Sequence, residues 1–273
     1  MIKLADLLRM QIESKVGNYH QSLLKPPISN EDDFIERTVQ AFQNFSASGG
    51  GQSLKTRSVK VDKKPIVSFV PCPPLRSSRA LHREIGDLLF VFKHFLRNKL
   101  DAHRASIVQT KYTSGTGKFW SIDTGQFLLM SYWPEFCILK PRKFSKTYDL
   151  RPKMLSWAIY GFVGPNVNVY PLYYSADRIL RSRKFPSSKH FSFSLNSMPT
   201  IWVYSAGFLS KLLGGFIGEN LFLNPEVKTL VDDLYKIAKL LPDPPGEFEW
   251  NNEEFEEGNN FGIIEFTITE QSE

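Results

Sequence analysis

Two strand-like runs, Gly86 to Phe92 and Ala105 to Tyr112, most constrain how this chain can fold. Both are short and apolar, and both are rich in the residue types that favour strands. A helix-like segment follows at residues 123–132, after a Thr-Ser-Gly-Thr-Gly turn. Strands followed by a helix in this way indicate an α/β protein with a mixed central sheet flanked by helices.

Helices are expected before and after these strands. Apolar residues at helical spacing predict a helix within residues 2–26, and an acidic first turn, Glu31-Asp32-Asp33, begins a second helix that extends to about Phe45. The glycine-rich and basic residues 48–64 predict a flexible loop. Further elements are expected as strands at residues 66–70, 136–139, 154–163 and 167–173, and as helices at residues 205–217 and 224–241.

Charge is distributed unevenly along the chain. The formal net charge is +6, but residues 240–273 contain ten Asp and Glu and no Lys or Arg. The first 239 residues therefore carry 34 basic against 18 acidic side chains, a net charge of +16. Such an excess favours a polyanionic partner, because clustered Lys and Arg release counterions from phosphates. A generally basic, soluble surface explains the charge equally well.

Several classes of protein are disfavoured by the sequence. The two cysteines, Cys72 and Cys137, are too few for a disulfide framework and lack zinc-site spacing. Charged residues interrupt residues 1–15, which therefore do not fit a secretory signal, and a cytoplasmic location is expected. The apolar segment from Ile201 to Gly218 contains four glycines and is expected to be a buried helix, so no membrane partner is predicted.

The strongest chemical signal is the stretch Arg83-Glu84-Ile85-Gly86-Asp87, together with Gln109-Thr110-Lys111 on the next strand. Side chains alternate along a strand, so Gln109 and Lys111 share one face. Metal-assisted phosphodiester hydrolysis needs oxygen ligands for Mg²⁺ and a group that orients water. Asp87 and the Gln-x-Lys pair would supply both at one end of the sheet.

This arrangement resembles the PD-(D/E)xK nuclease superfamily, in the restriction-endonuclease-like branch that has glutamine in place of the acidic residue of the last motif. The resemblance is limited to residues 66–136. It implies a restriction-endonuclease-like α/β fold and Mg²⁺- or Mn²⁺-dependent cleavage of DNA, in a role such as restriction or anti-phage defence. By position, Asp87 would be the metal carboxylate, Gln109 would occupy the (D/E) position and Lys111 would be the motif lysine.

The resemblance implies roles for three more residues. Glu84 would supply an additional carboxylate near the metal, and Gln126 would face the site from the helix that follows the lysine strand. Because Gln109 offers only a neutral carbonyl, an acid from the second helix is expected to compensate, and Glu36 is the predicted one. Each residue alone is most often an ordinary strand-end or surface residue. The expected metal ligands are therefore Asp87, Gln109, Glu84 and Glu36, and the expected catalytic residues are Asp87, Gln109, Lys111, Glu84 and Gln126.

Two basic runs are candidate phosphate contacts, and solvated loops are the alternative for both. The first connects the two strands and contains Lys93, Arg97 and Lys99; the second contains Arg181, Arg183 and Lys184.

An aromatic cluster surrounds Gln126 in the sequence. Its rings either stack on nucleic-acid bases or pack the helix onto the sheet, and packing is the favoured interpretation. The cluster consists of Trp120, Tyr132, Trp133 and Phe136.

The expected organisation has four parts. Residues 1–64 form N-terminal helices and a basic loop, residues 65–145 the nuclease-like core, residues 146–242 an α+β extension and residues 243–273 an acidic tail. Within the tail, the stretch from Glu247 to Glu257 either folds over the basic surface and competes with DNA or is a solubilising segment. Residues 263–268 alternate enough to form a final strand.

Three functions are compatible with these observations. An active nuclease is the first, as a homodimer or within a larger defence complex. Its target is left open between double-stranded DNA, single-stranded DNA and RNA. A catalytically weakened DNA-binding or assembly subunit is the second, favoured by the glutamine at position 109. An interaction module without a nucleic-acid partner is the third, in which the basic runs are only surface.

Overall fold

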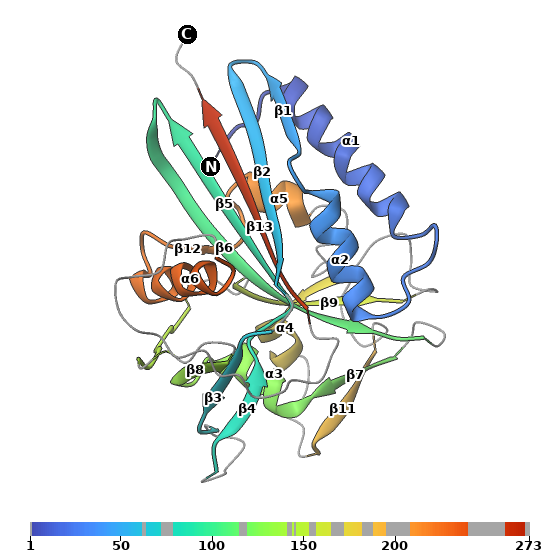
Figure 1. Cartoon of the computed structure of the whole chain (residues 1–273), viewed down its shortest axis with the longest axis vertical. Coiled ribbons are helices and arrows are strands. Elements are labelled where there is room, and N and C mark those ends of the chain that lie inside the picture. The colour runs from blue at the N-terminus through green and yellow to red at the C-terminus, as the bar shows by residue number, and fades with distance from the viewer. Residues whose placement is uncertain are drawn as a thin grey trace.

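The computed structural model describes residues 2–61, 64–71, 79–114, 119–140, 144, 146–152, 157–164, 172–181, 188–194, 208–239 and 260–270. An eight-stranded sheet lies at its centre, with strand order β1-β2-β13-β5-β6-β9-β10 and with β12 paired to β6 (Figure 1). These strands are β1 (Ser46–Gly49), β2 (Gln52–Val61), β5 (Leu88–Leu96), β6 (Lys99–Tyr112), β9 (Ala158–Val163), β10 (Leu172–Ser175), β12 (Glu219–Asn220) and β13 (Phe261–Glu270).

The central sheet is mixed. β5 and β6 are antiparallel neighbours, whereas β13 runs parallel to β5 and β9 runs parallel to β6. Two smaller sheets lie beside it. One has the order β4-β3-β8, from β3 (Ile66–Phe69), β4 (Leu81–Glu84) and β8 (Phe136–Lys140); the other pairs β7 (Phe119–Asp123) with β11 (His190–Ser194).

Helices cover both faces of the central sheet, which confirms the α/β class. One apolar core contains side chains from α1 (Asp6–Ser22), α2 (Glu31–Ala41) and α5 (Phe208–Leu213), and the other from α3 (Thr124–Tyr132), α4 (Ala176–Arg181) and α6 (Pro225–Ile237). Successive residues of β5 alternate between the two cores, with Leu88 in one and Leu89 in the other. A strand buried on both faces needs a continuous apolar run, which is the pattern that predicted β5.

Polar side chains at the helix starts fix where these helices begin. Asn30 accepts a hydrogen bond from the Asp33 backbone N–H at 2.8 Å and caps α2. Asp123 caps α3 in the same way, through the Gln126 N–H at 2.8 Å. Such caps satisfy backbone donors that have no partner inside the helix. They also hold the first turns of α2 and α3, where the candidate site is found.

The prediction of a flexible loop at residues 48–64 is wrong for most of these residues. Residues 46–61 form the β1–β2 hairpin, which turns at Gly50 and Gly51. Leu54 and Thr56 are buried, while Lys55 and Arg57 point to solvent. One face of the strand is therefore polar, and the basic side chains on it produced the loop-like composition.

The last described segment lies inside the sheet and is not a free tail. The expected final strand is confirmed as β13, which pairs antiparallel with β2 and parallel with β5 (Figure 1). The stretch from Glu247 to Glu257 lies outside the described residues. The central sheet takes strands from all four parts into which the sequence was divided.

Several predicted elements are present in positions that the sequence did not indicate. Strands at residues 66–69 and 136–140 are confirmed, but they pair with each other outside the central sheet. The strand that returns beside β6 is β9. Residues 93–99, expected as a connection, form the end of the β5–β6 hairpin with its turn at Arg97 and Asn98.

The structure also bears on the apolar segment and on the two cysteines noted in the sequence. In the described part of the chain, no helix has the length and apolar character needed to cross a membrane. Cys137 carries a free thiol on β8. Cys72 lies outside the described residues.

Candidate active site

Asp87 lies at the entry to β5, where the neighbouring strands β6 and β13 hold its backbone. Its N–H donates to the Val108 carbonyl at 2.8 Å, and its carbonyl accepts from the Gly262 N–H at 2.8 Å. The preceding Gly86 has φ +159°, and a Cβ there would lie 2.7 Å from Ile107 Cγ1. Glycine is therefore required at this position, because no side chain fits between the backbone and β6.

The Asp87 carboxylate is buried and makes contacts through both oxygens. Oδ2 accepts from Gln109 Nε2 at 2.7 Å and from the Thr110 N–H at 2.5 Å. Oδ1 lies 2.8 Å from Lys64 Nζ, but no described group makes a well-aligned hydrogen bond to it. Oδ1 thus keeps capacity to accept a further ligand.

Lys64 is the cation that neutralises this carboxylate. Its side chain is 4% exposed, and Nζ also lies 3.2 Å from Glu84 Oε2. Burial lowers the pKa of Lys64, but the carboxylates of Asp87 and Glu84 outweigh burial and hold this pKa above its ordinary value. The lysine is therefore charged, and two carboxylates converge on one positive charge.

Gln109 and Gln126 extend the network toward α3. Gln126 Nε2 donates to Gln109 Oε1, and Gln126 is buried at the start of α3. Gln126 therefore faces the site from the helix for which it was predicted. The Gln109 carbonyl, expected as a metal ligand, is instead bonded to Gln126, and its amide N–H points to Asp87. A metal at this carbonyl would have to share the oxygen with the Gln126 N–H.

Lys111 lies at the end of β6 beside the first turn of α2. Its Nζ is 3.5 Å from Glu31 Oε1, which also accepts from the Tyr112 N–H at 3.1 Å. Burial raises the pKa of Glu31 and the negative charge of Asp87 adds to this, while the charge of Lys111 opposes it. Glu31 is thus a carboxyl group that holds its proton more tightly than usual.

The acid contributed by the second helix is Glu31 and not Glu36. Glu36 has a 47% exposed side chain that pairs with Lys60 at 3.4 Å and accepts from Gln40. The two glutamates lie five residues apart on α2, so their side chains contact different neighbours. Glu31 belongs to the acidic first turn of α2, and no local feature distinguishes it from Asp32 and Asp33 in the sequence.

Three other contributors to the site were not predicted. Lys64 had no signal in the sequence beyond its charge. Arg83 binds Asp123 through Nε at 2.6 Å and Nη2 at 3.2 Å, which holds the cap of α3 against β4. Tyr160 lies opposite Gln109 in the β6–β9 register, and its buried hydroxyl has no hydrogen-bond partner among the described residues. Burial raises the pKa of Tyr160, with further effects from Asp123 and Asp87.

Asp87 and Glu84 fit a hard divalent cation in donor type and in charge. Their oxygens already converge on a cation, Lys64 Nζ, at 2.8 and 3.2 Å. Within the described ranges, no three His, Cys, Asp or Glu side chains are grouped closely enough to hold a metal. A metal here would therefore be held by two carboxylates and water, and Lys64 would have to move aside.

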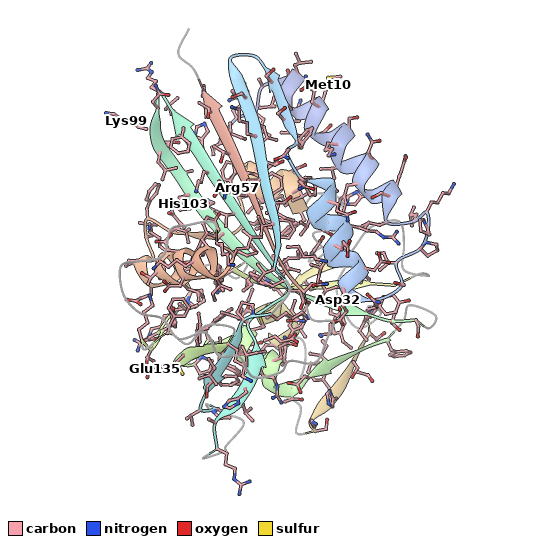
Figure 2. The ribbon with its side chains drawn as sticks, in the orientation of Figure 1. Met10, Asp32, Arg57, Lys99, His103 and Glu135 are labelled. Atoms are coloured by element: carbon pink, nitrogen blue, oxygen red, sulfur yellow. The ribbon has the colours of Figure 1, made fainter. Side chains whose placement is uncertain are left out.

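The predicted phosphate contacts at residues 93–99 lie far from this cluster. Lys93 is paired with Glu265 at 2.6 Å. Arg97 lies ten residues beyond Asp87 on an extended strand, hence about 30 Å away, and Figure 2 shows Lys99 at the far tip of the hairpin. Arg181 ends α4, but its side chain, Arg183 and Lys184 lie outside the described residues.

Known proteins give no external guide to this site. No family model, no curated protein and no solved structure matches the chain.

Proposed function

We propose that the protein is a metal-dependent nuclease that hydrolyses phosphodiester bonds of DNA, with a restriction-endonuclease-like core. The observation that carries this proposal is the convergence of Asp87, Gln109 and Gln126 in one buried network, with Lys111 and Glu31 at its edge. Asp87, Gln109 and Lys111 come from neighbouring strands, Gln126 from the helix that follows the lysine strand, and Glu31 from the second helix. That is the arrangement which the family resemblance implies.

In this mechanism Asp87 and Glu84 would hold the metal ion, Mg²⁺ or Mn²⁺. When bound, the ion would polarise a phosphate oxygen and neutralise charge that develops on it. Lys111 orients the attacking water and stabilises the pentavalent transition state. Glu31 suits the role of proton acceptor for that water, since its pKa is raised and it lies beside Lys111.

The positive charge of the first 239 residues supports a nucleic-acid substrate. Phosphate backbones reward such a charge excess through counterion release, so affinity should fall steeply with salt. A role in restriction or anti-phage defence, acting as a dimer or within a larger complex, is part of the same proposal and follows from the family resemblance.

Cleavage of a supercoiled plasmid and of a single-stranded circle tests the proposal. Wild type is compared with Asp87→Ala, Lys111→Ala and the surface control Lys60→Ala, each with Mg²⁺, Mn²⁺ or EDTA. We expect metal-dependent cutting by wild type and Lys60→Ala, and none by the other two variants. Full metal-dependent cutting by Asp87→Ala would refute the assignment of this site.

A second candidate is a DNA-binding or assembly subunit that has lost catalysis. The ion pair of Lys64 with Asp87 and the inward amide of Gln109 favour it, because both neutralise Asp87 without a metal. Salt-sensitive DNA binding without cutting by any variant would identify this case. A protein that neither cuts nor binds DNA would be an interaction module.

A further inference from the structure

A cavity lies at the opposite end of α3 from Gln126. It has a volume of about 320 Å³, and it is lined by the C-terminal end of α3, by Arg151 and Pro152, by Trp157 and Ala158 and by Asp177 of α4. The aromatic cluster noted in the sequence contributes to it only in part. Trp120 and Phe136 are buried in the core, whereas Tyr132 is 41% exposed and Trp133 lines the cavity.

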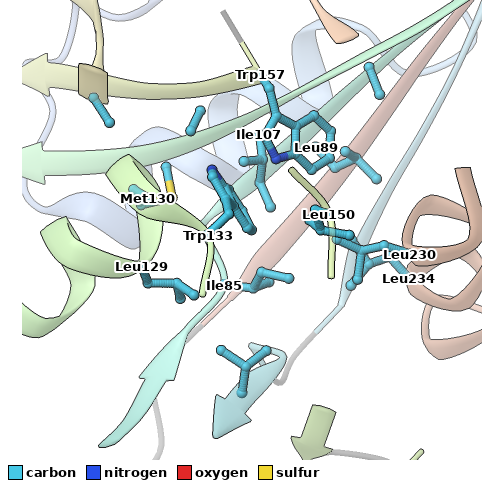
Figure 3. Close-up of a cluster of buried hydrophobic side chains, with 14 of the residues drawn as sticks. Ile85, Leu89, Ile107, Leu129, Met130, Trp133, Leu150, Trp157, Leu230 and Leu234 are labelled. Carbon is cyan, nitrogen blue, oxygen red and sulfur yellow. The ribbon is translucent and has the colours of Figure 1, made fainter. Parts of the chain in front are cut away.

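Two indole rings form the wall of this cavity. Trp133 and Trp157 are 4% and 0% exposed, and their ring centroids lie 5.5 Å apart. Figure 3 shows the two rings beside each other, with Met130 of α3 next to Trp133. Trp133 ends α3 in a left-handed conformation, φ 47°, which a residue with a side chain adopts at a cost.

Three hydrogen-bonding groups in the cavity wall have no partner. The Nε1 atoms of Trp133 and Trp157 and the Oγ of Ser131 are buried and make no hydrogen bond with any described residue. Buried donors are normally satisfied, and orphaned donors around a cavity indicate water or a ligand. By contrast, Trp120 Nε1 donates to the Val163 carbonyl at 3.1 Å.

The chemistry of the cavity selects its ligand. Indole faces favour a planar aromatic ring, and the N–H donors favour acceptor atoms on that ring. Arg151 lies at the rim with an 82% exposed side chain that is paired with Asp149 at 2.7 Å, and a phosphate would replace this partly exposed carboxylate as its partner. The volume is at the lower end of the range of about 300–1,000 Å³ for small-molecule sites, which fits a single nucleotide.

We infer that this cavity binds one nucleotide, with its base against Trp133 and Trp157 and its phosphate toward Arg151. The choice of a nucleotide rests on the proposed function, while the cavity and its orphaned donors stand without it. Trp133 lies seven residues after Gln126 on α3, a distance of about 10 Å. The base of a substrate strand a few nucleotides from the cleaved bond, or a free nucleotide, would fit this spacing.

Calorimetric titration with AMP, GMP, CMP and dTMP, and with single-stranded oligonucleotides, tests the inference. Trp157→Phe and Trp133→Phe keep a ring but remove the donor, and Trp120→Phe is the matched control. We expect the first two variants to weaken binding about tenfold, as for the loss of one buried hydrogen bond, and the control to leave it unchanged. Arg151→Ala, on the surface, should weaken AMP but not adenosine.

The two sources of the base give different results. Binding of mononucleotides indicates a free ligand, whereas binding of oligonucleotides alone, lost when one position is made abasic, indicates a base of the strand. If folded Trp157→Phe and Arg151→Ala bind every probe as wild type does, the inference is wrong. Asp87→Ala separates this site from the proposed activity, because it should abolish cutting and leave nucleotide binding intact.

Discussion

Replacing Lys64 with methionine tests the electrostatics of the site most directly. The substitution keeps an unbranched side chain only one atom shorter and leaves Asp87, which is fully buried, without its cation. Removing one partner of a buried ion pair typically costs about 3–5 kcal/mol, because the other charge stays desolvated. Asp87 keeps its bonds from Gln109 and Thr110, so we expect the lower end, about 3 kcal/mol.

Urea unfolding at pH 7 in EDTA measures this loss, and Lys60→Met is the matched control. Lys60 also pairs with a glutamate, but its side chain and that of Glu36 are 34% and 47% exposed. An exposed pair is worth about 0–1 kcal/mol. A loss for Lys64→Met no larger than for Lys60→Met would refute the view that Lys64 neutralises a buried charge.

The same variant reports on the metal. If Lys64 occupies the place of a divalent ion, its removal should strengthen metal binding, and Mg²⁺ should then stabilise Lys64→Met more than wild type. A ligand at a hundred times its Kd adds about 2.7 kcal/mol. An equal effect of Mg²⁺ on both proteins would show that Lys64 and the metal do not compete.

Three further predictions follow from neighbouring features. Gln109→Glu places a second carboxylate where an amide now lies 2.7 Å from Asp87. In EDTA the variant should lose about 2–3 kcal/mol of unfolding free energy, and Mg²⁺ should restore it. A variant as stable as wild type in EDTA would contradict this. Truncation after residue 259 removes Ile263, Phe266 and Ile268 from the core, which should lower the free energy of unfolding by at least about 5 kcal/mol. Circular dichroism should then show an unfolded chain. Removal of residues 271–273 alone should leave the spectrum of the folded protein. Burial and, less strongly, Lys93 and Lys228 lower the pKa of His103 to about 4. The unfolded chain therefore binds this proton at a higher pH than the folded chain does, and the free energy of unfolding should fall as pH drops from about 6.5 to 4. In His103→Phe it should fall less. If urea unfolding gave the same dependence of unfolding free energy on pH for His103→Phe and wild type, the prediction for His103 would be wrong.

Local patterns predicted the elements around the site well. β5 and β6 are visible as apolar runs because both faces of each strand are buried, and α3, which follows β7, carries its own cap at Asp123. The order of Asp87, Gln109, Lys111 and Gln126 therefore translated directly into proximity. Period-two alternation placed Gln109 and Lys111 on the same face.

Long-range pairing was not predictable in the same way. β13 is inserted between β2 and β5, and no local property of residues 261–270 specifies a central position. The sequence also could not distinguish Glu31 from Glu36, because the choice depends on the angle at which α2 meets the end of β6. Lys64 is placed by the crossing from β2 to β3, between two different sheets.

The cost of the buried network is itself an argument for a role beyond stability. Asp87, Lys64, Gln109 and Gln126 are all almost fully buried, next to a core that is otherwise apolar. Apolar residues of similar volume at such positions often give equal or greater stability than a buried ion pair. Gly86 adds a backbone position that admits no side chain. A chain under selection for folding alone would have little reason to keep these groups at one sheet end, so a charge-dependent function is the simpler account.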